Sequence, residues 1–174
     1  MQRTLVMTII GPDRPGLVES VASLVRQHQG NWLESRMSRL GGQFAGILRV
    51  AVPADAEAAL TGALQDLATR GLAVVVQPDQ PSPPSDQASM RQLEIIGQDR
   101  PGIVQQIASA LAKHGINVEE LETECVSAAM SGETLFKARA ELRVPANANI
   151  AALKAELEKI ASDLIVEVAF LKLA

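Results

Sequence analysis

The sequence is poor in cysteine and in aromatic residues. Its 174 residues include one cysteine, Cys125, no tyrosine, one tryptophan and three phenylalanines. A single cysteine excludes an internal disulfide framework and a thiolate metal cluster. The scarcity of aromatic rings argues against RNA binding on an open sheet, because that mode of binding needs rings on which bases stack.

Basic patches and long apolar runs are lacking as well. The formal net charge is −4, with acidic and basic residues interspersed, so we expect no direct contact with nucleic acid. No apolar run approaches the roughly 18 residues of a membrane span, and the first residues lack the charged and apolar pattern of a secretion signal, so we expect none. His28 and His114 have no cysteine or carboxylate at metal-ligand spacing. We therefore expect a cytoplasmic protein with no metal, no cofactor and no membrane partner.

The chain does contain a repeated motif. Residues 11–18 read Gly-Pro-Asp-Arg-Pro-Gly-Leu-Val, and residues 97–104 read Gly-Gln-Asp-Arg-Pro-Gly-Ile-Val. An apolar, β-rich run precedes each copy and a helix-period pattern follows it, so the motif predicts a strand-to-helix turn. The glycines permit the turn, and Pro15 and Pro101 suit the first helical turn. Such a turn exposes a helix N-terminus suited to a small anion or zwitterion.

The pattern around each motif predicts the order β-α-β-β-α-β. In the first half we expect strands at 4–10, 31–40, 44–52 and 72–76, helices at 17–30 and 54–69, and a hairpin at Gly41-Gly42. The second half repeats these elements. The spacing between matched positions widens from 86 to 92 within the second hairpin, which indicates about six extra residues near 128–133.

Two domains are therefore predicted, at 1–77 and 90–174, joined by a proline-rich linker at 78–89. Each should be an α+β, ferredoxin-like βαββαβ sandwich, in which two helices cover one face of an antiparallel four-stranded sheet. A two-layer unit of roughly 80 residues buries little surface. We therefore expect its open face or edge strands to be covered by another copy, either the twin in the chain or a second chain.

A βαββαβ unit whose first turn reads Gly-x-Asp-Arg-Pro-Gly, with Asn opening the second strand, resembles an ACT domain, a small regulatory module that senses amino acids. The resemblance covers nearly the whole chain as two tandem copies. It implies that a small amino acid, such as glycine or serine, binds at the first turn and the start of the second strand, near an interface between paired domains. The matching positions are Asp13, Arg14, Pro15, Gly16 and Asn31 in the first copy, and Asp99, Arg100, Pro101, Gly102 and Asn117 in the second.

The resemblance also implies a mode of action. We expect no attached catalytic or helix-turn-helix region, and in this respect the chain is most similar to tandem-ACT transcriptional repressors of the glycine cleavage system. Those proteins act by contact with a DNA-binding transcription activator and are tuned by glycine. We therefore expect a non-catalytic, amino-acid-responsive regulator of transcription in glycine or amino-acid metabolism, with a protein partner and a homodimer formed by ACT pairing.

Each predicted site residue also has a structural interpretation. The Asp of each motif suits a ligand ammonium or a cap for its own helix, and the Arg suits a carboxylate clamp, a partner domain or a solvated position beside Asp. The glycine before each helix serves backbone geometry, and its amide is available to a carboxylate. Asn31 and Asn117 suit ligand contact or a turn after a helix. The acidic segment 119–124 suits a charge-protected edge strand or a contact surface for a basic partner.

Two other functions use the same topology. Acylphosphatases share the βαββαβ order, an Arg in the first turn and a downstream Asn. This sequence lacks their Gly-rich loop with its Val-Gln-Gly core, and Pro15 removes an amide that a phosphate cradle would use. The other alternative is a pure protein-interaction module that binds no ligand.

Overall fold

The alternation of apolar and polar residues along the strands builds two separate four-stranded sheets. The computed structural model describes residues 1–80, 88–127 and 133–172. The chain divides into a first unit, Met1–Ser82, and a second unit, Pro83–Ala174. The predicted linker lies mostly outside the described residues, as does the insertion expected in the second hairpin.

The first unit has the predicted βαββαβ order. Its elements are β1 (Gln2–Pro12), α1 (Leu17–Gln27), β2 (Asn31–Leu40), β3 (Gln43–Pro53), α2 (Glu57–Gln65), the 3-10 helix η1 (Asp66–Arg70) and β4 (Ala73–Pro78). The strands pair antiparallel in the order β2-β3-β1-β4. The prediction of one long helix over 54–69 is wrong at its end, because the last turn tightens into η1 and carries Leu67 into the core at 6% exposure.

The second unit repeats this architecture. Its elements are β5 (Ser89–Gln98), α3 (Ile103–Lys113), β6 (Asn117–Ser127), β7 (Thr134–Val144), α4 (Ile150–Leu164) and β8 (Val166–Lys172), with the sheet order β6-β7-β5-β8. The acidic segment 119–124 therefore lies on an edge strand. The predicted fold class is confirmed in both units.

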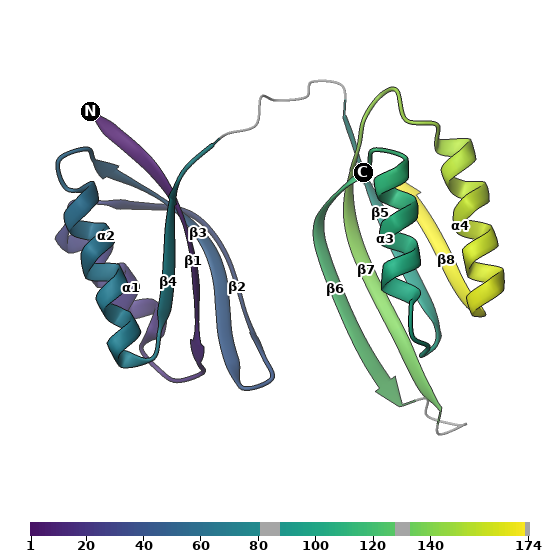
Figure 1. Cartoon of the computed structure of the whole chain (residues 1–174), viewed down its shortest axis with the longest axis horizontal. Helices are drawn as coiled ribbons and strands as arrows, with labels where there is room; N and C mark the ends of the chain where they lie inside the picture. The colour runs from purple at the N-terminus through teal and green to yellow at the C-terminus, as the bar shows by residue number, and fades with distance from the viewer. Residues whose placement is uncertain (81–87, 128–132, 173–174) are drawn as a thin grey trace. The chain divides into compact units, whose positions relative to one another are not determined.

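Each core lies between the sheet and its two helices, which cover one face and leave the other open (Figure 1). In the first unit Leu5, Met7 and Ile9 alternate along β1 and meet Val21 and Val25 of α1, and each is at most 2% exposed. Burying one such side chain stabilises the fold by about 1.5–3 kcal/mol. The intervening residues of the strands point to the open face.

A β-bulge occurs at the same place in both units. The register jumps from Trp32 to Glu34 in β2 and from Val118 to Glu120 in β6, so each strand carries one extra residue. The extra residue reverses the faces that later side chains take. Met37 consequently packs against the core of the first unit.

The helices of the described ranges are short. The longest of them, α4, has 15 residues. No helix within these ranges has the length and apolar character needed to cross a membrane.

Candidate ligand-binding site

The turn between β1 and α1 depends on a left-handed glycine. Gly16 has φ 89°, and Gly102 has φ 98° at the matching position of the second unit. Other residues are strained in this region, so the motif requires glycine here. The Gly16 carbonyl accepts the Ser20 amide at 2.9 Å, which makes Gly16 the N-cap of α1, and no side chain caps the helix. The first amides of α1 are therefore open to an anion.

Pro15 and Pro101 lie outside the helices. The prediction that they occupy the first helical turn is wrong, because a left-handed glycine stands between each proline and the first helical residue, Leu17 or Ile103. Since the helix begins after the glycine, neither proline removes an amide from its first turn.

Asp13 contacts β2 and not the helix. Its Oδ2 atom lies 2.6 Å from Nε of Arg39, and its backbone N–H donates to the Gly42 carbonyl at 2.9 Å. The interpretation of Asp13 as a helix cap is therefore wrong. Sequence reasoning did not single out Arg39. The Gly41-Gly42 hairpin could have indicated Arg39, because it places Arg39 opposite Phe44. Phe44 pairs with Gly11, so Arg39 lies at the end of the sheet where β1 leads into α1.

Arg14 links the turn to the end of η1. Its Nη2 atom donates to the Arg70 carbonyl at 2.7 Å. A cation is favourable at the C-terminal end of a helix, where carbonyls lack partners within the helix. A guanidinium has five N–H donors, so this contact leaves most of them for another group.

The turn of the second unit has different contacts. Arg100 donates through Nη2 to Gln98 Oε1 at 3.1 Å, and the Asp99 backbone N–H donates to the Thr134 carbonyl at 3.0 Å. The strand position that matches Arg39 of the first unit is Cys125, since it lies opposite Phe136 as Arg39 lies opposite Phe44. The two turns therefore differ in the charge that surrounds their Asp.

Asn31 lies at the other end of its sheet from the turn. It pairs with Ala51, which pairs with Thr4, whereas the turn follows Pro12. Thr4 and Pro12 are eight residues apart along β1, which is about 26 Å at about 3.3 Å per residue. The cause is the crossover through α1, which makes β2 run in the same direction as β1 and begin at the same end of the sheet, with β3 between them.

Asn117 occupies the matching position in the second unit. It pairs with Arg143, which pairs with Met90 near the start of β5. Its Nδ2 atom donates to Glu119 Oε1 at 2.6 Å, and Arg143 donates to the other oxygen of the same carboxylate at 3.0 Å. Each unit thus brings its predicted Asp, Arg, Pro and Gly together at one end and places its predicted Asn at the other.

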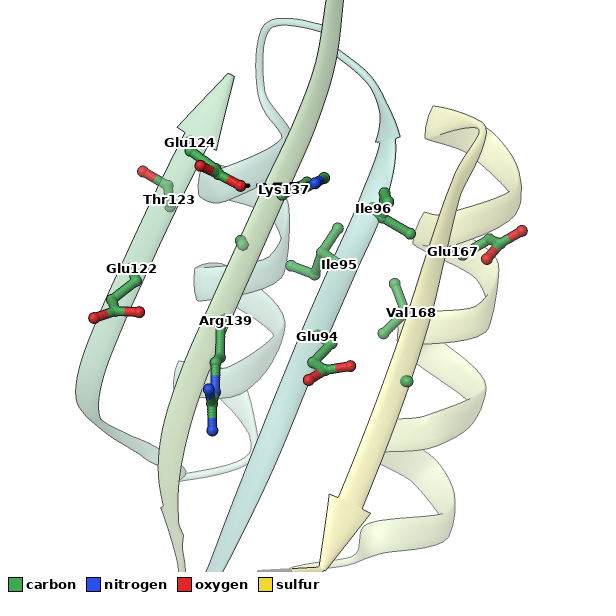
Figure 2. A pocket seen from close by; sticks show the side chains of 12 residues that line it. Glu94, Ile95, Ile96, Glu122, Thr123, Glu124, Lys137, Arg139, Glu167 and Val168 are labelled. Atoms are coloured by element: carbon green, nitrogen blue, oxygen red, sulfur yellow. Dashed lines mark ion pairs between the residues drawn. The ribbon is translucent and has the colours of Figure 1, made fainter. Parts of the chain in front are cut away.

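A hollow of about 710 Å³ lies on the open face of the second sheet, away from both turns. Figure 2 shows Glu122 and Glu124 on β6, Arg139 on β7 and Glu94 on β5 around it. Lys137 Nζ lies 3.7 Å from Glu124 Oε1. None of the predicted turn residues lines this hollow. Within the described ranges, no group of three or more His, Cys, Asp or Glu side chains is placed to hold a metal ion.

Two ion-paired clusters tie elements together outside the turns. Arg49 on β3 lies 2.7 Å from Asp79 and 3.4 Å from Glu34, and the hydrogen bond to Asp79 is the main cause that raises the pKa of Arg49. Glu156 on α4 accepts from Lys113 at 3.0 Å, and this hydrogen bond lowers the pKa of Glu156.

Comparison with known proteins agrees with this architecture. ACT-domain family models match residues 3–77 and residues 91–137. No curated protein sequence matches the chain. The solved structure of an unknown protein from Galdieria sulphuraria is similar over 100% of both chains, with a TM-score of 0.89 and 27% identity. The structure of a putative glycine cleavage system transcriptional repressor shares the fold over 99% of both chains, with a TM-score of 0.71 and 21% identity.

The two matched ranges span most of the chain, and each includes the strand, turn and helix that the repeated motif builds. The chain belongs to the ACT-domain family and carries two ACT domains in tandem.

Proposed function

We propose that the chain is a non-catalytic, amino-acid-responsive regulatory protein that acts through contact with a protein partner. The observation that carries this proposal is the duplicated turn. In each ACT domain a left-handed glycine opens a helix that has no side-chain cap, with an Asp and an Arg of the same motif beside it. Membership of a regulatory family and the shared fold with the repressor structure support a role in the transcriptional control of glycine or amino-acid metabolism.

The chemistry of the turn suits a free α-amino acid. The open amides of a helix N-terminus, with the positive end of the helix dipole, bind a carboxylate. The motif Asp offers an acceptor for the ammonium group. Asp13 is already paired with Arg39 at 2.6 Å, whereas Cys125 stands at the matching position beside the second turn. We therefore expect Asp99 to accept an ammonium more readily than Asp13.

The proposed site is completed by a second domain. Within one unit Asn31 lies at the far end of the sheet from Asp13, and Asn117 is likewise far from Asp99. One small ligand can therefore touch both a turn and an Asn only where another ACT domain, the twin in the chain or a domain of a second copy, brings its Asn beside the turn. A homodimer formed by ACT pairing meets this requirement.

The proposed partner is a DNA-binding transcription activator. The chain has a net charge of −4, which does not favour its own contact with DNA. Regulation of transcription would then depend on protein contact, with the bound amino acid changing the affinity for the activator.

Isothermal calorimetry tests the ligand part of this proposal. The full chain is titrated with glycine, serine and a panel of other amino acids, and we expect saturable binding of a small one. In the Arg14→Ala/Arg100→Ala variant the affinity should fall at least about 10-fold, the effect of losing a hydrogen bond to a charged group. The Arg26→Ala/Lys159→Ala variant removes the same charge from two exposed positions in other parts of the units, and should bind normally.

Two results would count against the proposed site. Unchanged binding in the folded Arg14→Ala/Arg100→Ala variant would contradict the assignment to the turns. Absence of binding to every amino acid would favour the alternative of a pure protein-interaction module, and a pull-down with candidate activators would then test the partner.

A further inference from the structure

The net negative charge of the chain belongs to the second unit. The first 82 residues carry seven Lys or Arg and seven Asp or Glu, so the net charge of −4 comes from the residues that follow them. Much of this acid lies on the side of the second sheet that α3 and α4 leave uncovered, which we call the second open face (Figure 1). Its six glutamates are Glu94, Glu120, Glu122, Glu124, Glu141 and Glu167.

Cations on the second open face neutralise only part of this acid. Lys137 Nζ lies 3.7 Å from Glu124 Oε1. Arg139 and Glu94 are linked through Gln92, whose amide accepts from Arg139 at 3.1 Å and donates to Glu94 at 2.5 Å. Arg143, farther along β7, is held by Glu119 at 3.0 Å. Among the residues that the structure describes, four glutamates of this face make no hydrogen bond or ion pair: Glu120, Glu122, Glu141 and Glu167.

Stability of the fold does not account for this arrangement. Glu120 lies directly opposite Glu141, and like charges at such a position destabilise an antiparallel pair. The matching pair in the first sheet, also the first beyond the bulge, is Glu34 with Arg49, 3.4 Å apart. A charge-protected edge needs charge only on β6, whereas Glu141 and Glu94 lie on the inner strands. The acidic face therefore calls for a partner outside the unit.

The hollow on the second open face has the width of an α-helix. Figure 2 shows Glu122 and Glu167 on opposite sides of it with Ile96 between them, and Ile96 is 41% exposed. Three strand spacings separate β6 from β8, about 14 Å at about 4.8 Å each. An α-helix with its side chains is about 10–12 Å across. A helix lying along the hollow would have an apolar side chain beneath it and unpaired carboxylates on both sides.

We propose that the second open face docks a basic amphipathic helix of a partner protein. The apolar stripe of the helix covers Ile96, and Lys or Arg side chains on its two flanks reach Glu122 on β6 and Glu167 on β8. A second copy does not fit in the same way, because its second open face carries the same excess of negative charge. The inference rests on the partner contact of the proposed function and does not depend on amino-acid binding.

Fluorescence anisotropy of the full chain with a labelled peptide tests this proposal. The probe is a peptide of about 15 residues of Leu, Ala and Lys, with leucines in one helical stripe and lysines on both sides of it. We expect saturable binding that weakens as salt is raised, and no binding of the same peptide with Glu in place of Lys. The titration contains no amino acid, so it is read independently of the turns.

The Glu122→Gln/Glu167→Gln variant removes one unpaired carboxylate from each side of the hollow. Its Kd for the Lys peptide at low salt should be at least about 5-fold higher than that of the wild type. Glu158→Gln/Asp163→Asn is the matched control, because it removes the same charge from two exposed side chains of α4. The control should bind the peptide like the wild type, and circular dichroism checks that both variants fold.

Three results would overturn the proposal. The first is a wild type that does not bind the Lys peptide. The second is an equal loss of affinity in both variants, because net charge and not this face would then govern binding. The third comes from sedimentation of the same samples: self-association that only Glu122→Gln/Glu167→Gln changes would place a second copy on the face. Calorimetry with amino acids reports on the turns separately, so failure of this proposal is distinguishable from failure of the proposed function.

Discussion

Gly16→Ala should weaken the first unit through backbone strain alone. Gly16 has φ 89°, and a Cβ added to it would have no heavy atom within 4 Å, so the substitution causes no clash. A residue other than glycine in the left-handed region costs about 1–2 kcal/mol. Alanine recovers about 0.4–1 kcal/mol because it restricts the unfolded chain. We therefore expect a net loss of about 1 kcal/mol.

Gly11 provides the contrasting case in the same motif. A Cβ on Gly11 would lie 2.5 Å from the Gly71 carbonyl oxygen and 3.2 Å from Leu72 Cα, both backbone atoms. Gly11→Ala should therefore cost about 1–3 kcal/mol through overpacking. Asparagine separates the two causes, because it tolerates the left-handed region but not a clash. Gly16→Asn should be milder than Gly16→Ala, and Gly11→Asn no milder than Gly11→Ala.

Urea unfolding and thermal melting of the full chain measure these differences. A loss of 1 kcal/mol lowers the melting temperature by about 4–8 °C in a domain of this size. If Gly16→Asn loses as much stability as Gly16→Ala, strain at a left-handed residue is not the cause. If neither variant loses stability, the turn does not hold the φ that the structure shows.

Two further predictions concern the second unit. The hydrogen bond from Lys113 lowers the pKa of Glu156 from its ordinary value of 4.5. The charged carboxylate therefore stabilises the folded state above pH 4.5. This stabilisation is lost as the pH falls through the pKa that Glu156 has in the folded chain, which is lower. In urea unfolding between pH 7 and pH 3, the stability gap between wild type and Glu156→Gln should close in acid, whereas a constant gap would contradict this. Ile165 has φ 57° and is 63% exposed, at the position where the first unit has Gly71. Ile165→Gly should therefore raise the unfolding free energy by about 1 kcal/mol, and a less stable variant would refute the strain.

The sequence predicted the order of elements because the repeat supplied each pattern twice. The period-two alternation of residues 136–144 and the helical spacing after each motif indicated the strands and helices directly. The glycine of the turn was predictable as well, because a tight strand-to-helix junction favours a residue that adopts a positive φ. The end of α2 could not be predicted from the sequence pattern, because the change from α-helix to 3-10 helix depends on how Leu67 packs into the core.

The contacts of the candidate site depend on register, which the spacing of residues in the chain does not provide. The ion pair between Asp13 and Arg39 needs the sheet order and the bulge in β2. The bond from Arg14 to the Arg70 carbonyl needs the path of η1. The separation of Asn31 from the turn follows from the direction of β2. The motif positions in the sequence therefore grouped Asn31 with turn residues that lie at the opposite end of the same unit.

The shared bulge has a consequence for how these strands can evolve. A substitution in β2 changes one side chain, but an inserted or deleted residue beyond Trp32 exchanges the two faces of every residue up to the hairpin. Arg39 would then leave Asp13 and Met37 would leave the core, while the backbone ladder could still form. A change in the composition of β2 is thus compatible with these contacts, whereas a change in the number of residues between the bulge and the hairpin is not.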